Sequence, residues 1–319
     1  MLDKADAFLA LVRTLPLPLS AALDKLPRDI ARQVEEIRLR AGRPLALTLQ
    51  GRTGFISPTG CLHDVPEGGL PITAALLEDT FLRLCAYSVH TREAELEAGY
   101  LAVQGGHRAG LCGQAVVSEG RVRGFSPLSG INLRVASERH GCASPLLHLV
   151  ESTAEGLRAG LLIAGPPGSG KTTLLRDIAR HLGHGGYRTT VADERGEIAA
   201  VYGGVPQNDV GQCDVLSGYG KADAIALATR TLNPQILILD EIGSEAEADS
   251  VIRALWAGVA CVATVHAPHL QGLMRHAAAA TLIRSGVFAH IAVLGERPGD
   301  IADVTNAAQL LRGGGIHVA

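Results

Sequence analysis

The sequence predicts an α/β protein with two domains: a smaller mixed α+β domain at residues 1–143 and a domain with a mostly parallel sheet at residues 144–319. Three observations predict this fold class. The chain has 319 residues, enough for two domains of about 150 residues each. Apolar residues make up 47% of the sequence, so each domain can fill a core. From residue 160 onward, short apolar stretches alternate with helix-like ones, which is the pattern of βαβ units.

The first half of the chain mixes helical and strand periodicity. Apolar residues recur every three or four positions in the predicted helices, and they alternate with polar residues in the predicted strands. Pro16 and Pro18 end the first helical stretch, because a proline lacks the backbone donor and crowds the preceding turn. In chain order, the predicted elements are a helix-like segment at 8–30, two short strands within 36–50, a helix at 72–88, and strands at 99–103, 108–117 and 131–135.

The second half alternates strands and helices. Short apolar strands separated by helices favour a parallel sheet covered on both faces, because the crossovers are right-handed. A helix at 145–157 precedes them, and the domain boundary is expected between Ala136 and Glu155. In chain order, the other predicted elements are strand 160–164, helix 170–182, strand 188–192, helix 221–232, strand 235–240, helix 244–257 and strand 260–266.

Charge and composition argue against a nucleic-acid partner. The net charge is −3, with +1 on residues 1–150 and −4 on the remainder, so neither half attracts a phosphate backbone strongly. Aromatic residues are only 3% of the chain, which leaves few platforms on which the bases of a single strand could stack.

The sequence predicts a cytoplasmic location without a membrane span. No uncharged apolar run reaches the roughly 18 residues that a spanning helix needs. Asp3, Lys4 and Asp6 precede the first apolar run, unlike a signal peptide. The six cysteines are far apart without a C-x-x-C pair, so we expect free, mostly buried thiols in a reducing compartment.

Residues 165–172 read GPPGSGKT and fit the phosphate-loop pattern G-x-x-x-x-G-K-[ST]. Chance alone gives about 0.005 matches in a chain of this composition, so an ordinary glycine turn is a poor alternative. Lys171 is expected to bridge the β- and γ-phosphates of ATP, the Thr172 hydroxyl to ligate Mg²⁺, and Thr173 to face the α-phosphate. The predicted phosphate-binding residues are Gly165, Pro166, Pro167, Gly168, Ser169, Gly170, Lys171, Thr172 and Thr173.

A second acidic motif, ILILDE at 236–241, places two carboxylates at the end of an apolar strand. Ligands bind at the carboxyl ends of the strands in such sheets. Asp240 is therefore expected to join the Mg²⁺ shell, and Glu241 to orient or deprotonate the attacking water. The alternative is a solvated acidic turn, which is less attractive about 70 residues after a phosphate loop.

Two further strand ends carry polar side chains. The segment VADERGEI at 191–198 brings Asp193 and Glu194 to the same sheet edge, where these carboxylates are expected to polarise water or join the magnesium shell. A surface pair between Asp193 and Arg195 is the alternative. In ATVHA at 263–267, Thr264 or His266 is expected to sense the γ-phosphate, with a packed histidine as the alternative.

Arg230 lies ten residues before Asp240 on the predicted helix 221–232. It is expected either to contact phosphate across a subunit boundary or to pair with an acidic neighbour. The sequence does not decide between the two roles.

These four motifs, in this order, resemble those of the secretion ATPase superfamily, which includes type II and type IV secretion motors and pilus motors. GPPGSGKT resembles Walker A, VADERGEI the aspartate box, ILILDE Walker B, and ATVHA the histidine box. The resemblance implies a RecA-like P-loop ATPase domain. These motors often have Gly-Glu where this chain has Asp240-Glu241, a pair closer to the general RecA and AAA pattern, so hydrolysis should be unimpaired.

The first half extends the resemblance over about residues 5–310. EIRLRAGRP, GGHRAGLCGQAV and SGINLRVA are similar to signatures of the family of stage III sporulation protein AA. That family implies a soluble, cytoplasmic ATPase motor of the mother cell that works as a hexamer. The resemblance further implies that membrane proteins recruit the motor to a channel into the forespore. It also implies that N-terminal arginines reach the phosphates. Arg108 and Arg134 are candidates, with ordinary ion pairing as the alternative.

Two other functions remain open from the sequence. A nucleic-acid translocase uses the same kind of core, since fold alone does not fix function. A nucleotide-gated scaffold would bind ATP only to control assembly, although an intact Glu241 argues for hydrolysis.

Overall fold

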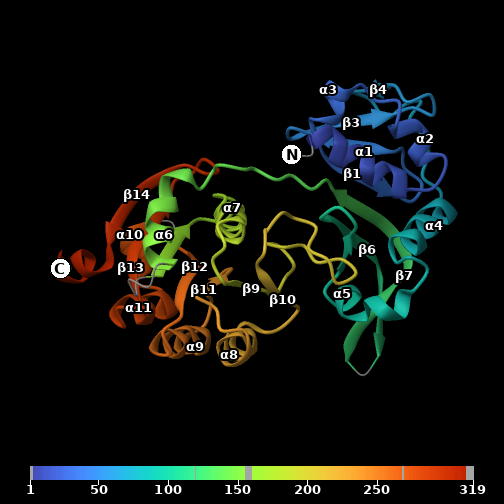
Figure 1. The fold of residues 1–319 in the computed structure, drawn as a ribbon. Helices are drawn as coiled ribbons and strands as arrows, with labels where there is room; N and C mark the ends of the chain where they lie inside the picture. Colours follow the sequence, from blue (N-terminus) through green and yellow to red (C-terminus); the bar gives the residue numbers. More distant parts are fainter. Residues whose placement is uncertain (1–2, 119, 155–159, 268, 314–319) are drawn as a thin grey trace. The chain divides into compact units, whose positions relative to one another are not determined.

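A computed structural model of the chain describes residues 3–118, 120–154, 160–267 and 269–313. The chain divides into two compact units (Figure 1). The N-terminal unit contains residues 1–137 and also the segment Tyr202–Gln207, and the C-terminal unit contains the rest. The return of Tyr202–Gln207 to the N-terminal unit was not predicted from the sequence. The predicted domain boundary after residue 143 stays a prediction.

The N-terminal unit is built on an antiparallel sheet in the order β4-β3-β2-β1-β7-β6-β5. The predicted helical segment 8–30 is three short helices, because its prolines interrupt it. The elements are α1 (Lys4–Thr14), α2 (Leu19–Leu23), α3 (Arg28–Ala31), β1 (Val34–Arg40), β2 (Ala46–Leu49), β3 (Arg52–Ile56), β4 (Leu62–His63), α4 (Ala74–Leu84), η1 (Val89–Arg92), α5 (Glu93–Glu97), β5 (Tyr100–Val103), β6 (His107–Ser118) and β7 (Arg121–Arg134).

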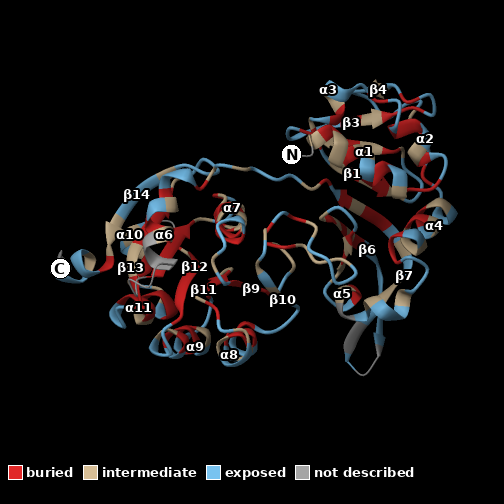
Figure 2. Cartoon of the chain, viewed as in Figure 1, coloured by how far each residue is buried: buried red, intermediate tan, exposed pale blue. Residues whose placement is uncertain are grey.

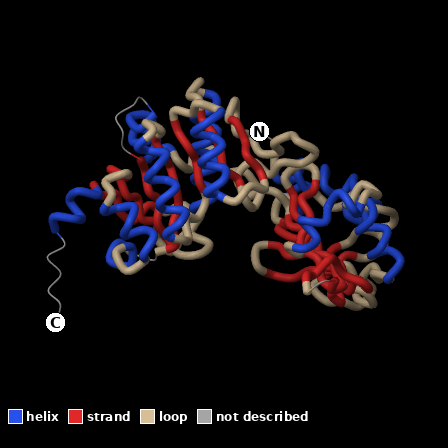
Figure 3. Tube along the Cα trace, turned by 90° about the horizontal axis from the view of Figure 1, so that it is seen from below, coloured by secondary structure: helices blue, strands red, loops and turns tan. Residues whose placement is uncertain are grey.

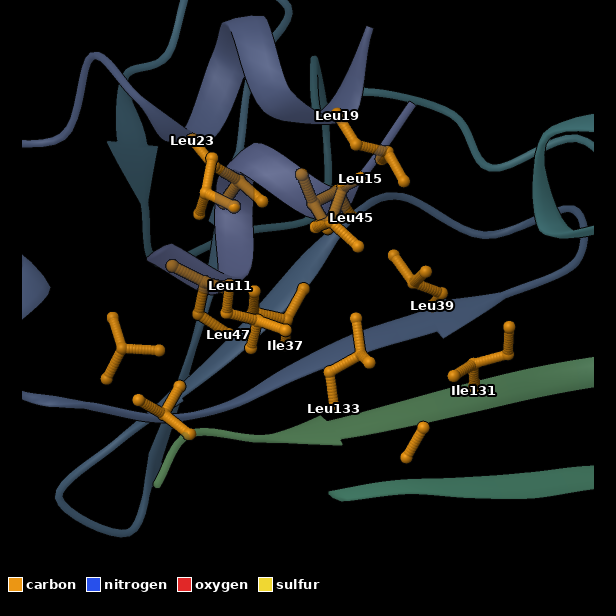
Figure 4. Packing of buried hydrophobic residues seen from close by; sticks show 14 of the residues in the cluster. Leu11, Leu15, Leu19, Leu23, Ile37, Leu39, Leu45, Leu47, Ile131 and Leu133 are labelled. Atoms are coloured by element: carbon orange, nitrogen blue, oxygen red, sulfur yellow. The ribbon is translucent and has the colours of Figure 1, made fainter. Parts of the chain in front are cut away.

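The core of this unit forms where α1 and α2 pack on the sheet. Alternate residues of the strands point to one face, so the apolar ones meet the helices there. Figure 4 labels the packed side chains of Leu11, Leu15, Leu19, Leu23, Ile37, Leu39, Leu45, Leu47, Ile131 and Leu133.

His107, the first residue of β6, is buried in this unit, with 2% of its surface exposed. Its Nδ1 accepts a hydrogen bond from the Ala136 backbone N–H over 2.9 Å. Burial lowers the pKa of His107 from 6.5 to about 4, because the charged imidazolium is poorly solvated there. The folded unit therefore holds this histidine neutral.

We expect the free energy of unfolding to fall as the pH drops from 6.5 toward 4. The unfolded chain takes up the proton near pH 6.5, whereas the folded chain does so only near pH 4, so acid favours unfolding in this window. Between pH 7 and pH 5 the wild type should lose about 2 kcal/mol more than His107→Asn, which keeps an acceptor but does not titrate. Urea unfolding followed by circular dichroism measures this difference, and equal losses would contradict the prediction.

The C-terminal unit contains a sheet in the order β10-β9-β11-β12-β8-β13-β14, parallel except for the edge strand β14. Strands β10, β13 and β14 were not predicted from the sequence. The elements are η2 (Ser144–Leu146), α6 (Leu147–Ala154), β8 (Gly160–Gly165), α7 (Lys171–His184), β9 (Thr189–Asp193), β10 (Asp214–Ser217), α8 (Lys221–Thr231), β11 (Ile236–Leu239), α9 (Glu245–Trp256), β12 (Ala260–His266), α10 (Leu270–Leu273), α11 (Ala277–Arg284), β13 (Phe288–Leu294), β14 (Ile301–Asn306) and α12 (Ala307–Gly313).

Helices cover both faces of this parallel sheet, as the sequence predicts. Residues of α6 and α7 pack with Leu161 and Ile163 of β8, whereas residues of α8, α9 and α11 pack with the neighbouring Leu162 and Ala164. Figure 2 shows the resulting buried positions along the strands and the inward sides of the helices, and Figure 3 shows strands and helices packed together in each unit. The carboxyl ends of β8, β9, β11 and β12 therefore lie at one exposed edge.

Candidate nucleotide-binding site

The loop between β8 and α7 turns tightly, and its glycines make the turn possible. Gly168 and Gly170 have φ angles of +76° and +94°, the left-handed region that residues with a Cβ rarely adopt. A Cβ on Gly165 would lie 2.6 Å from Ser169 Oγ, too close for any side chain. The loop thus delivers the chain directly to the amino end of α7, where free N–H groups and the helix dipole favour an anion.

The turn between β13 and β14 supports this loop. The Gly299 N–H donates to the Ser169 carbonyl over 2.8 Å, and a Cβ on Gly170 would lie 3.0 Å from Gly299 N. This contact was not predicted from the sequence. The Pro298-Gly299 pair predicts a turn in this segment, but it does not indicate which residues the turn contacts.

Lys171, the first residue of α7, is almost fully buried at the end of the loop. Its Nζ donates to the carbonyls of Gly165 and Pro166, over 2.9 Å in each case. Burial lowers the pKa of Lys171, and the nearby carboxylates of Asp240 and Glu241 oppose that effect. A positive charge is thus held where the loop would bind phosphates.

Four oxygens from three residues meet beside Lys171, at the end of β11. The Thr172 hydroxyl donates to Asp240 Oδ2 over 2.9 Å. The Thr264 hydroxyl, on β12 and fully buried, donates to Asp240 Oδ1 over 2.7 Å. Carboxylate and hydroxyl oxygens are ligands that Mg²⁺ takes beside nucleotide phosphates, so this group fits a magnesium ion.

Thr264 also fixes the residue after Asp240. Its Oγ1 accepts the Glu241 backbone N–H over 2.7 Å, and its carbonyl accepts the Ile242 N–H over 2.8 Å. Glu241 has a φ of +42°, a strained value for a residue with a Cβ. Thr264 was a candidate phosphate sensor in the sequence, and that role stays a prediction. In the structure Thr264 binds the Asp240 carboxylate and the backbone N–H groups of Glu241 and Ile242.

The Glu241 carboxylate lies between two basic side chains. Its Oε1 is 3.1 Å from His266 Nε2, and its Oε2 is 3.5 Å from Arg195 Nη1. His266 Nδ1 is in turn 3.2 Å from Lys171 Nζ. Because an ammonium group can only donate, Nδ1 accepts and Nε2 carries the proton toward Glu241. His266 therefore contacts both Lys171, through a hydrogen bond, and Glu241, at an ion-pair distance.

The loop after β9 presents Glu194 and uses Asp193 internally. Asp193, with 1% of its surface exposed, accepts the backbone N–H groups of Glu197, Ile198 and Ala199 over 2.8–3.1 Å. Asp193 therefore shapes the loop. Glu194 is exposed, and its Oε2 accepts from Lys221 Nζ over 2.7 Å.

Arg230 lies away from this group of residues, and the other two predicted arginines belong to the N-terminal unit. Arg230 is exposed at the far end of α8 from Lys221, about 13 Å along the helix axis, and lines a groove between α8 and α9 with Arg253. Arg108 and Arg134 belong to the N-terminal unit, where they are register partners on β6 and β7. Their contact with nucleotide stays a prediction.

Both arginines of the N-terminal unit have partners within it. Arg108 stacks over the Tyr100 ring at 4.2 Å, and Arg134 lies 3.6 Å from Glu36. The alternative of ordinary ion pairing therefore has direct support for Arg134.

The residues present fit a nucleotide with its magnesium ion. The Ser169 hydroxyl is buried in the loop without a hydrogen-bond partner among the described residues, which is unusual for a buried polar group unless a ligand uses it. The loop glycines, Lys171 and the oxygens around Asp240 surround the same end of α7.

This fold is that of a RecA-like P-loop domain. The pilus retraction motor PilT with bound ADP has a TM-score of 0.56 at 18% identity, over 83% of this chain and 76% of that one. The Legionella pneumophila ATPase DotB has a TM-score of 0.50 at 16% identity, over 82% of this chain and 72% of that one. The fold class predicted from the sequence is confirmed.

The chain belongs to the family described as sporulation stage III, protein AA, whose model matches residues 11–309. It is 35% identical to stage III sporulation protein AA of Bacillus subtilis (strain 168) over 271 residues, 83% of each chain. This confirms the resemblance drawn from the motifs. Within the described ranges, no helix combines the length and apolar character needed to cross a bilayer.

Proposed function

We propose that this protein is a Mg²⁺-dependent ATPase that acts as a motor during sporulation. The observation that carries the proposal is the meeting of Thr172 and Thr264 on Asp240, next to Lys171 and Glu241. A site that holds a charged phosphate and its metal would explain why these side chains converge at one sheet edge. Membership of the sporulation family and the fold shared with a pilus retraction motor support the motor role.

The proposed mechanism uses each residue where it lies. The phosphates draw Lys171 Nζ from the carbonyls of Gly165 and Pro166, and the loop N–H groups bind their oxygens. Thr172 and Asp240 would hold a magnesium ion, which would neutralise the charge that develops on the phosphates. Glu241 accepts a proton from the attacking water, a new P–O bond forms at the γ-phosphorus, and the bond to ADP breaks.

The basic side chains beside the Glu241 carboxylate suit its role as the base that accepts a proton from water. His266 and Arg195 keep the carboxylate in place before the reaction. His266 lies against both Lys171 and Glu241, so movement of either one on nucleotide binding reaches the other. Glu194 and, from a neighbouring subunit, Arg230, Arg108 and Arg134 are proposed to complete the site.

The wider role follows from the family. We place the protein in the mother-cell cytoplasm, at the membrane through partner proteins of a channel into the forespore, as a hexamer whose subunits share nucleotide sites. Hydrolysis at successive sites would then move the two units of each subunit and do mechanical work.

The test is ATP hydrolysis by the purified chain, measured as phosphate release with Mg²⁺ and with excess EDTA. We expect turnover only with Mg²⁺, and an increase in particle mass when a non-hydrolysable ATP analogue is added. Tight ATP binding without any turnover, also with the membrane partners present, would instead favour a scaffold. Strong, salt-sensitive stimulation by DNA would favour a translocase.

A further inference from the structure

Lys221 is a buried cation at the amino end of α8, with 8% of its surface exposed. This placement is unfavourable for the helix alone, because the dipole makes its amino end positive. Burial of an ammonium group is also costly unless anions surround it. The side chains that contact Lys221 must therefore account for its position.

Two glutamates meet Lys221, one from the loop after β9 and one from the first turn of α9. Glu194 Oε2, in the loop after β9, lies 2.7 Å from Nζ. Glu247 Oε1, in the first turn of α9, lies 3.6 Å from it. Lys221 thus joins the loop after β9 to the first turn of α9.

Glu247 carries the contact to the backbone next to Glu241. Its Oε2 accepts the N–H groups of Gly243 over 2.8 Å and Ser244 over 3.0 Å, in a capping box at the start of α9. Burial raises the pKa of Glu247, but these hydrogen bonds and Lys221 outweigh it, so the pKa is lowered and the carboxylate stays ionised. Glu247 therefore fixes the turn after the strained Glu241, and Lys221 contacts the other oxygen of the same carboxylate.

A small cavity lies between these elements. It holds about 10 Å³ and is lined by Glu194, Lys221, Asp240 and Glu241, among others. That volume is about what one water molecule needs, and the lining offers polar partners. Both glutamates that could polarise a water thus face one cavity, and each is paired with a cation.

We infer that Lys221 is a positioning residue for hydrolysis, which holds Glu194 at this cavity and fixes the turn after Glu241. The inference deepens the proposed ATPase function and rests on it. Lys221 contacts none of the phosphate-loop residues in the interactions described, so its loss should affect turnover and leave ATP binding intact.

The experiment compares Lys221→Met, Lys221→Arg and Glu194→Gln with the wild type, with exposed Lys25→Met as the matched control. We expect Lys221→Met to lower kcat by about tenfold to 100-fold, because small misplacements of reacting groups have effects of this size. KM and the dissociation constant for a fluorescent ATP analogue should change less than about twofold. Lys221→Arg should restore most of kcat, since it keeps the charge.

The double variant Lys221→Met with Glu194→Gln tests the route. If Lys221 acts through Glu194, the two losses should not multiply. Unchanged kcat in Lys221→Met, or equal losses of kcat and ATP affinity in folded protein, would overturn the inference while the wild-type ATPase stands. If Lys221→Met unfolds, the inference is tested with Lys221→Arg and Glu194→Gln instead. A wild-type kcat in Glu194→Gln would then overturn the inference. A wild type without turnover would defeat the proposed function itself.

Discussion

Glu241→Gln should lower the rate of ATP hydrolysis by about 100-fold to 10,000-fold while ATP still binds. The amide has almost the same shape as the carboxylate, so the contacts of the Glu241 backbone with Thr264 remain. It cannot accept a proton from water, and it loses the charge that His266 and Arg195 face. Single-turnover phosphate release and binding of a fluorescent ATP analogue measure the two effects separately.

Glu245→Gln is the matched control for this prediction. Glu245 is exposed in the first turn of α9, four residues from Glu241, and carries the same charge change. Its variant should hydrolyse ATP at the wild-type rate. If Glu241→Gln does so as well, Glu241 is not the base, and the same assay on Glu194→Gln would show whether the neighbouring loop supplies it.

The phosphate loop could be predicted in detail because its constraints are local. Left-handed backbone at Gly168 and Gly170 demands glycine, and the lysine and threonine that follow sit on the first turn of one helix. The apolar strand before the loop and the apolar face of the helix after it are equally local. The positions of these residues could therefore be predicted without knowledge of contacts between distant parts of the chain.

The role of Thr264 could not be predicted, because it depends on how two strands align. Leu239 of β11 pairs with Ala263 of β12, and this register places Thr264 beside Asp240 and Glu241. A shift of one residue would turn its side chain to the other face. A sequence shows which strands end in polar residues, but the register is set by packing of the whole sheet.

The segment Tyr202–Gln207 shows a second limit. It follows the aspartate box in the chain, yet it belongs to the N-terminal unit. The Arg92 guanidinium lies 5.3 Å from the Tyr202 ring centre, and the Gly105 N–H donates to Gln207 Oε1 over 2.8 Å, across 102 positions of sequence. Single polar contacts between residues so far apart produce no periodic pattern in the sequence from which they could be predicted.

Asp193 and Lys221 show a third limit, since charge alone does not reveal a partner. Both were visible as charged residues near predicted motifs. The structure shows that Asp193 satisfies three backbone N–H groups and that Lys221 is paired with two glutamates. Such buried arrangements depend on loops that close around the side chain.

Lys171→Ala should weaken ATP binding by about 100-fold or more, and hydrolysis should fall below detection. Hydrogen bonds from a charged donor contribute about 1.5–3 kcal/mol each, and Lys171 is placed to reach two phosphates, so their loss corresponds to at least about 100-fold in affinity. The fold should persist, because Lys171 contacts only two loop carbonyls and His266 in the interactions described. Isothermal titration with ATP and Mg²⁺ measures the affinity, and exposed Lys25→Ala is the control.

The comparison of this variant with Glu241→Gln separates binding from chemistry within one site. Lys171 and Glu241 are linked through His266, so a merely structural network would respond alike to the loss of either end. The proposed ATPase predicts opposite results instead: Lys171→Ala loses ATP affinity, whereas Glu241→Gln keeps it and loses turnover. Wild-type affinity in folded Lys171→Ala would place the nucleotide elsewhere, because no other described lysine lies in the loop that turns into α7.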